Sequence, residues 1–191
     1  SDRVSLGELD APEFRGRSRD EIGVLAESIA RMRKSLQLQA EMSGSGGPVF
    51  DVTLDNEDGA PVGGEVDHAH LIVSLLNGPD NRWGRVGVRL LPVTHPKFHD
   101  VARVVLASPR APAYLMLPKP ERLADVETAA RAIDALGGGA IPLHALVETH
   151  GALHQVFDIA AHPRIESLSF GLMDFVSAHR GAIPQTAMGG T

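Results

Sequence analysis

Residues 49–59 read VFDVTLDNEDG, a short apolar strand followed at once by three carboxylates and a glycine. Four further apolar runs follow along the chain, at about residues 86–91, 114–117, 141–147 and 165–170. Helical patterns separate these runs, at about residues 65–76, 98–106, 122–136 and 151–161. Strands that alternate with helices form parallel βα units, in which the helices cover the sheet. The pattern therefore predicts an α/β fold.

Two of the predicted helices end in residues that suit a left-handed cap. Asn77-Gly78-Pro79 follows the first helix, and Gly137-Gly138-Gly139 follows the third. Glycine adopts this conformation without steric cost. We therefore expect a residue with positive φ at both helix ends.

Charged side chains stand at the end of every predicted strand. They are, in chain order, Asp55, Glu57, Asp58, Arg89, Lys119, Glu148 and Asp174. In a βα barrel the loops that follow the strands converge on one face, where the reacting groups lie. We therefore expect these charges to meet at one rim.

The motifs around these charges occur in a defined order. Leu-Asp-x-Glu-Asp-Gly at 54–59 is followed by Arg89, by Leu-Pro-Lys at 117–119, by Glu-Thr at 148–149 and by Ser-Phe-Gly-x-x-Asp at 169–174. With this order, residues from about 48 to 184 resemble the citrate lyase beta-subunit and malyl-CoA lyase family. The resemblance implies a partial (β/α)8 TIM-type barrel, comprising about strands 2–6. It also implies a Mg²⁺-dependent carbon–carbon lyase that cleaves a CoA thioester by aldol or Claisen chemistry.

The resemblance assigns the catalytic roles to Arg89, Glu148 and Asp174. Glu148 and Asp174 would be the protein ligands of Mg²⁺, and Arg89 would hold the carboxylate of the substrate, an acyl-CoA or a 2-oxo or hydroxy acid. Mg²⁺ prefers oxygen ligands and usually takes only one or two carboxylates, and a Lewis acid at the reacting oxygen favours cleavage. The alternative is that both carboxylates form ordinary salt bridges with Arg89 or Lys119.

Lys119, Glu57 and Asp58 are the further candidates for substrate binding, and Asp55 would shape the rim beside them. Lys119 would form a Schiff base, the other route to aldol chemistry, only if its pKa were lowered. Nearby carboxylates favour the charged ammonium instead. An ion pair or a contact with a CoA phosphate is therefore the expected role of Lys119.

The histidines are weaker candidates. His144 shares strand parity with Glu148 and is expected in the core or beside the site. Two histidine pairs have i,i+4 spacing without the glutamate of the zincin pattern, His95 with His99 and His150 with His154. We expect these four on the surface.

The first 42 residues follow a different pattern. A heptad stripe predicts an amphipathic helix with a coiled-coil seam, made by Ile22, Leu25, Ile29, Met32 and Leu36. The loop at 7–14, with Asp-Glu-Ile-Gly at 20–23, resembles the connector and second helix of a HAMP signalling domain. This second resemblance implies the alternative function, a dimerisation and signal-relay module. A Gly/Ser linker at 43–47 would join it to a catalytically silent barrel segment at 48–191.

Composition narrows the possible partners. The formal net charge of −6 argues against nucleic-acid binding, which needs clustered Lys and Arg. The chain contains no Cys, which excludes thiolate nucleophiles and Cys-ligated zinc. No apolar run reaches the roughly 18 residues of a membrane span. A cytoplasmic location is expected.

The length of the barrel segment sets a further expectation. Residues 48–191 are fewer than the roughly 250 residues of a complete (β/α)8 barrel. We expect the first strand and the strands after the sixth to be absent, and two sheet edges to be exposed. We therefore also expect a homo-oligomer, and no turnover by this chain alone.

Overall fold

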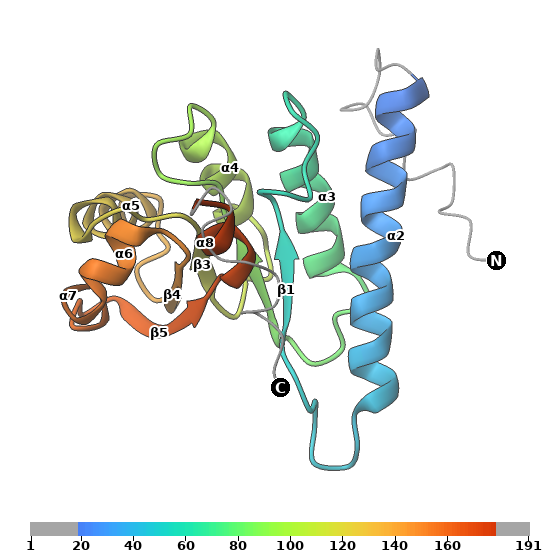
Figure 1. Cartoon of the computed structure of the whole chain (residues 1–191). Helices are drawn as coiled ribbons and strands as arrows, with labels where there is room; N and C mark the ends of the chain where they lie inside the picture. Colours follow the sequence, from blue (N-terminus) through green and yellow to red (C-terminus); the bar gives the residue numbers. More distant parts are fainter. Residues whose placement is uncertain (1–18, 179–191) are drawn as a thin grey trace, which may run out of the picture.

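The computed structural model describes residues 19–178 of the chain. Within these residues a five-stranded parallel sheet keeps the strands in chain order (Figure 1). The strands are β1 (Val52–Asp55), β2 (Val86–Arg89), β3 (Leu115–Leu117), β4 (Leu143–Val147) and β5 (Ile165–Phe170). The helices that follow them are α3 (Glu65–Asn77), α4 (Phe98–Leu106), α5 (Leu123–Ala135), α6 (His150–His154), α7 (Val156–Ala160) and α8 (Leu172–Ala178). The predicted alternation of strands and helices is confirmed, and the architecture is that of a partial TIM-like barrel.

Apolar side chains join the helices to one face of the sheet. In β1, Val52 and Leu54 are buried in the hydrophobic core, whereas Thr53 and Asp55 are only half-buried. Successive side chains of a strand point to opposite faces, so Thr53 and Asp55 lie on the face away from this core. Fully buried members of the core include Ile72, Leu76, Val88, Phe98, Leu115, Ile133 and Leu143. This packing fixes the strands and thereby the positions of their ends.

The parallel register brings the strand ends to one edge of the sheet. Asp55 pairs with Arg89 across β1 and β2, and Val147 pairs with Phe170 across β4 and β5. The loops after the strands therefore leave from the same edge, as in other βα barrels. Within the described residues β1 and β5 are the outer strands of an open sheet.

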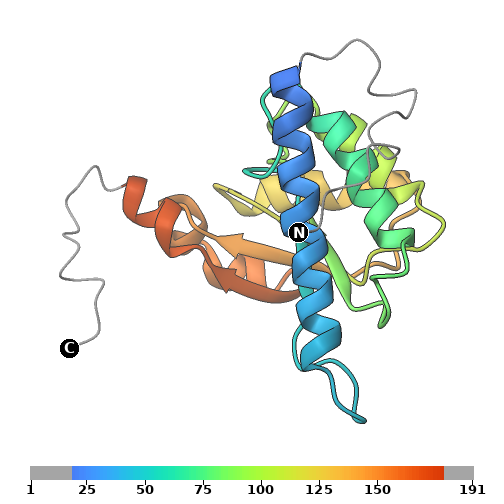
Figure 2. The same ribbon diagram turned by 90° about the vertical axis from the view of Figure 1, so that its right-hand side faces the viewer.

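Helix α2 (Arg19–Met42) lies alongside α3 and contacts β1 (Figures 1 and 2). Leu25, Ile29, Met32 and Leu36 of the heptad stripe are all buried, and Met32 and Leu36 belong to the core of the sheet. The predicted amphipathic helix is present, but its apolar stripe is covered by the same chain. This corrects the prediction of a seam that pairs with a helix of a second chain, because a neighbouring helix and strand of the same chain bury a heptad stripe equally well.

Polar contacts also attach α2 to the sheet. The side-chain Nε2 of Gln39 donates to the carbonyl oxygens of Phe50 at 2.8 Å and Arg85 at 3.2 Å. A tight turn with a hydrogen bond from the Gly47 N–H to the Gly44 carbonyl, at 3.1 Å, leads from α2 towards β1. The HAMP-like loop at 7–14 and the side chain of Ile22 lie outside the described part of the chain, so that resemblance stays a prediction.

The structure differs from the predicted helix ends at two places. Gly137 has the expected positive φ of 89°, but Gly78 has φ −72°, so the left-handed cap after α3 is wrong. The helix predicted at 151–161 is two short helices that meet at Gln155. The side chain of Gln155 accepts a hydrogen bond from the Leu123 N–H at the start of α5, at 2.9 Å. None of the described helices is both long and apolar enough to cross a membrane.

Candidate active site

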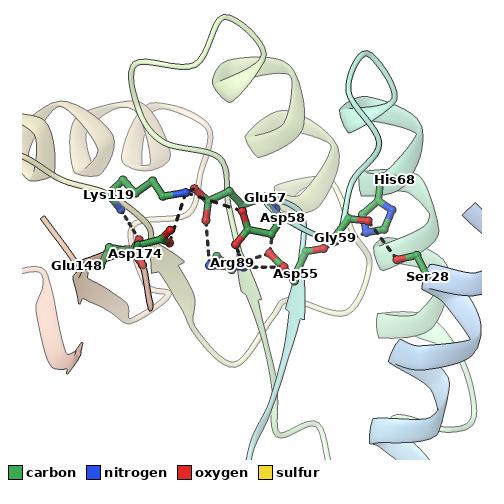
Figure 3. A network of polar contacts seen from close by, with 10 residues as sticks. All are labelled: Ser28, Asp55, Glu57, Asp58, Gly59, His68, Arg89, Lys119, Glu148 and Asp174. Atoms are coloured by element: carbon green, nitrogen blue, oxygen red, sulfur yellow. Dashed lines mark hydrogen bonds and ion pairs between the residues drawn. The ribbon is translucent and has the colours of Figure 1, made fainter. Parts of the chain in front are cut away.

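Seven charged side chains gather at the edge of the sheet where the strands end (Figure 3). We call this cluster the charged rim; its members are Asp55, Glu57, Asp58, Arg89, Lys119, Glu148 and Asp174. Ion pairs and hydrogen bonds connect all of them into one network. The structure thus brings together every residue that the strand ends singled out.

Arg89, the last residue of β2, is held by three carboxylates. Its Nε and Nη2 each donate to one oxygen of Asp55 at 2.7 Å, and Nη2 also donates to Asp58 at 2.9 Å. Its Nη1 lies 2.9 Å from Oε2 of Glu57. Burial would raise the pKa of Asp55, but the hydrogen bonds and charge of Arg89 outweigh it and hold that pKa below its ordinary value. A bidentate pair of this kind fixes the guanidinium in position.

Glu57 connects the two cations of the charged rim. Its Oε1 lies 2.9 Å from Nζ of Lys119, while its Oε2 faces Arg89 without hydrogen-bond geometry. The Glu57 side chain is only 8% exposed. Burial raises the pKa of Glu57 by more than the neighbouring cations lower it. Glu57 is therefore a buried carboxylate that depends on both cations to stay ionised.

Lys119 follows β3 and has a left-handed backbone, with φ 49°, which residues other than glycine rarely adopt. Its main-chain N–H donates to Oε1 of Glu148 at 2.9 Å. Its Nζ lies 2.9 Å from Glu57, 3.5 Å from Asp174 and 3.8 Å from Asp58. Burial would lower the pKa of Lys119, but the carboxylates outweigh it and raise that pKa. A lysine kept protonated in this way is poorly suited to Schiff-base chemistry.

Glu148 follows β4 and is the most buried carboxylate of the charged rim, with 3% of the residue exposed. Burial, then the negative charges of Glu57 and Asp174, raise the pKa of Glu148 to about 7, and a hydrogen bond with Asp174 adds to the effect. Gly171 packs directly on this side chain, because a Cβ at Gly171 would lie 2.5 Å from Oε2 of Glu148. Two carboxyl groups held together in this way form a site that favours added positive charge.

A pocket opens beside the two carboxyl groups. Its lining consists of Lys119, Glu121, Glu148, Thr149, His150, Asp174 and Ala178. Among the described residues no group of three or more His, Cys, Asp or Glu side chains is arranged to hold a metal ion. A cation here would therefore depend on Glu148 and Asp174. Mg²⁺ suits such a site, because it takes one or two carboxylates and leaves its other positions to water and substrate.

The loops around the pocket are braced against each other. Thr149 begins α6, where its hydroxyl oxygen accepts from the Ala152 N–H at 3.0 Å and its hydroxyl donates to the Pro120 carbonyl at 2.7 Å. A Cβ at Gly151 would lie 2.2 Å from the carbonyl oxygen of Glu121, so only glycine permits this approach. Thr149, Gly151 and Gly171 support the site, and the sequence interpretation missed their roles. Their position directly after a strand end was the available signal.

Of the histidines, His150 lines the pocket, whereas His144 lies at the opposite end of the strands from the network of charges. His144 stacks on Tyr114 with ring centroids 4.1 Å apart, and its Nε2 lies 3.0 Å from Glu166. It precedes Glu148 by four residues, or about 13 Å along a strand. His68 was not singled out by the sequence, although it is fully buried and its Nε2 bonds the Asp55 carbonyl at 2.9 Å. It supports the main chain under the charged rim.

Known proteins with similar sequences and structures narrow the chemistry. No family model matches the chain. A crystal structure of a citrate lyase from Burkholderia xenovorans LB400 matches with a TM-score of 0.75 and 53% sequence identity, over 82% of this chain and 50% of that chain. The resemblance to the citrate lyase beta-subunit and malyl-CoA lyase family that was predicted from the sequence is confirmed. The match to the citrate lyase includes residues before Pro48, because residues 48–191 alone make up less than 82% of the 191-residue chain. This agrees with the packing of α2 on the sheet.

Two curated relatives extend the comparison to malyl-CoA. Both are (3S)-malyl-CoA thioesterases, from two strains of Cereibacter sphaeroides, with 30% identity over 110 residues and 29% over 109 residues. These matches cover 57% and 56% of this chain. The chain spans 31% of each curated relative and half of the citrate lyase. Both curated relatives are thus named for an activity on a CoA ester.

Proposed function

We propose that the chain is part of a Mg²⁺-dependent carbon–carbon lyase that acts on a CoA thioester. The observation that carries the proposal is the pairing of Glu148 and Asp174 at a pocket that shares the charged rim with Arg89 and Lys119. The 53% identity to a citrate lyase supports this class of reaction. The homo-oligomer and the cytoplasmic location expected from the sequence stay predictions.

Glu148 and Asp174 would hold the ion, which when bound polarises the oxygen at the bond that breaks. Glu148 follows β4 and Asp174 lies in the first turn of α8, and both border the same pocket, so a substrate in the pocket would meet them directly. The two carboxyl groups interact with each other and share the lining of the pocket, which supports the proposal that they hold one cation. The main-chain N–H of Lys119 fixes Oε1 of Glu148, and Oε2 lies next to Gly171.

Arg89 would anchor a carboxylate of the substrate. Its Nη2 is shared between Asp55, whose side chain is 31% exposed, and Asp58, whose side chain is 60% exposed. A substrate carboxylate can take the place of Asp58 on Nη2, while the bidentate contact with Asp55 keeps the guanidinium in position. This exchange costs little, because an exposed ion pair contributes only about 0–1 kcal/mol.

Thioester hydrolysis is the second candidate function, because both curated relatives are malyl-CoA thioesterases. The two reactions differ in the bond that breaks. A lyase cleaves a carbon–carbon bond and leaves CoA joined to a shorter acyl group, whereas hydrolysis cleaves the carbon–sulfur bond and releases free CoA. Incubation with malyl-type thioesters and Mg²⁺ therefore separates them by product; the assay uses a chain extended to a complete barrel, because this chain alone is expected to show no turnover. We expect acyl-CoA and a carbonyl compound, and free CoA as the first product would contradict the lyase.

Calorimetric titration with Mg²⁺ tests the site itself. We expect binding by the wild-type chain and its loss in a variant that combines Glu148→Gln with Asp174→Asn. Glu166→Gln is the matched control, since it removes a carboxylate that pairs with His144 at the opposite end of the strands. Unchanged Mg²⁺ binding in the double variant would show that the carboxylates are not the ligands.

A further inference from the structure

The ammonium group of Lys119 lies between the two acidic parts of the charged rim. On one side it contacts Glu57 at 2.9 Å, and on the other it contacts Asp174 at 3.5 Å (Figure 3). Arg89 contacts Asp55, Glu57 and Asp58, so the positive charge near Asp174 comes from Lys119. Asp174 is one of the two carboxylates proposed to hold the metal ion. The Lys119 ammonium group therefore occupies space beside Asp174 that a bound metal ion would need.

The excess of carboxyl groups over cations in the charged rim makes the position of the Lys119 ammonium group important for metal binding. Five carboxyl groups face the two cations Arg89 and Lys119. Neighbouring carboxyl groups repel each other when ionised, so the pocket needs added positive charge. The Lys119 ammonium supplies part of it in the absence of metal. A divalent cation supplies more, but it would stand close to an ammonium group of the same sign.

We propose that Lys119 is a resident counterion of Asp174 that competes with the divalent cation, and that metal binding turns its ammonium towards an anionic group of the substrate. The inference rests on the proposed function, because it takes Glu148 and Asp174 as the metal ligands. It adds a coupling between metal and anion that the ligand assignment alone does not contain. The ligand class for the freed ammonium is a carboxylate or a phosphate.

The geometry allows the side chain to move while its backbone stays fixed. The main chain of Lys119 is held by its hydrogen bond to Glu148, and the neighbouring Pro120 carbonyl is held by Thr149. The side chain is 35% exposed, which leaves room for a change of rotamer. Its shortest contact is with Glu57, so it can release Asp174 and keep its main partner.

A positioning role for Lys119 predicts the opposite change in metal affinity from a competing role. If Lys119 instead held Asp174 in the orientation that a metal requires, removing the ammonium would weaken metal binding. If Lys119 competes, removing it would strengthen metal binding. The sign of the change in metal affinity therefore decides between competition and positioning.

Calorimetric titrations with Mg²⁺ and with Mn²⁺ at one pH provide the test. Lys119→Met removes the charge and keeps a long side chain on the same strained backbone, whereas Lys119→Arg keeps the charge. We expect Lys119→Met to lower the Kd of both ions at least about tenfold, within the range typical of coupling between bound groups. Lys119→Arg should stay within about twofold of wild type.

Lys97→Met is the control for a general loss of surface charge. Lys97 precedes α4, is 52% exposed and pairs with Asp100, outside the charged rim. We expect no more than about a twofold change in Kd from it, as for an exposed charge. Thermal unfolding of each variant verifies that it is folded. An unchanged or raised Kd in folded Lys119→Met would overturn the competition.

The same titrations separate this inference from the metal site. If Glu148→Gln and Asp174→Asn abolish binding and Lys119→Met has no effect, the site stands and the competition is wrong. If these two substitutions leave binding intact, the metal site is wrong and the inference falls with it. In the Mg²⁺-bound protein, a crystal structure should place Nζ of Lys119 beyond the 4 Å limit of an ion pair with Asp174.

Discussion

Replacement of Leu36 by alanine tests whether α2 supports the sheet or serves to pair two chains. Leu36 is fully buried and belongs to the same hydrophobic core as β1 and α3. Truncating a buried leucine removes its transfer free energy and leaves a cavity, which together cost about 2–5 kcal/mol. We expect a loss of about 3 kcal/mol in the free energy of unfolding.

Leu38→Ala is the matched control on the same helix. Leu38 is 39% exposed, so its truncation should change stability by no more than about 0.5 kcal/mol. Both substitutions replace leucine by alanine within one helix, so their effects on helix propensity cancel in the comparison. The difference between the two variants therefore measures the packing of the stripe.

Urea unfolding followed by tryptophan fluorescence provides the assay. Trp83, the only tryptophan of the chain, lies between α3 and β2 and so reports on unfolding away from α2. A lower midpoint in Leu36→Ala with an unchanged slope is the expected result. If the Trp83 transition is unchanged while Leu36→Ala converts a dimer to a monomer in sedimentation experiments, the stripe pairs two chains and the packing described for α2 is refuted.

Three further predictions concern the charged rim. Gly171→Ala places a Cβ 2.5 Å from Oε2 of Glu148, so it should lower the free energy of unfolding by about 1–3 kcal/mol and weaken Mg²⁺ binding. Gly46 has open space around it, so Gly46→Ala is the control and should change neither quantity. Thermal unfolding measures the stability and calorimetry measures the Mg²⁺ binding. The pKa of Glu148 is raised to about 7 in the folded chain, so the folded state binds the carboxyl proton more tightly than the unfolded state does. The free energy of unfolding should therefore fall as the pH rises from about 4.5 to about 7, by an amount of order 3 kcal/mol. Urea unfolding of metal-free protein at pH 5 and pH 8 checks this, and a Glu148→Gln variant that keeps the full difference would contradict it. Arg89→Met removes the guanidinium that contacts three carboxylates, of which Asp55 loses its cation, and should cost about 3–5 kcal/mol. Arg85→Met breaks one exposed pair and should cost much less, so equal losses in urea unfolding would refute the importance of the network.

The sequence by itself determined the order and type of the elements. The strand predicted at 165–170 and the helix predicted at 98–106 match β5 and α4 residue for residue. Local periodicity and breaking residues set these elements, because each depends on a few neighbouring side chains. The gathering of charges at one rim also followed from the sequence. Parallel strands in chain order must end at the same edge, so residues at strand ends meet there whatever the details of packing.

The tertiary structure decided which groups touch. A heptad stripe shows that one face of a helix is apolar, but it does not determine what covers that face. Here α3 and β1 of the same chain cover it, in place of a helix from a second chain. The bidentate pairing of Arg89 with Asp55, the position of Lys119 between Glu57 and Asp174, and the approach of Gly171 to Glu148 are contacts of a few ångströms between separate elements. Such distances depend on strand register, backbone conformation and burial together. Burial in turn sets the pKa of Glu148, because the cost of desolvating a charge depends on everything packed around it.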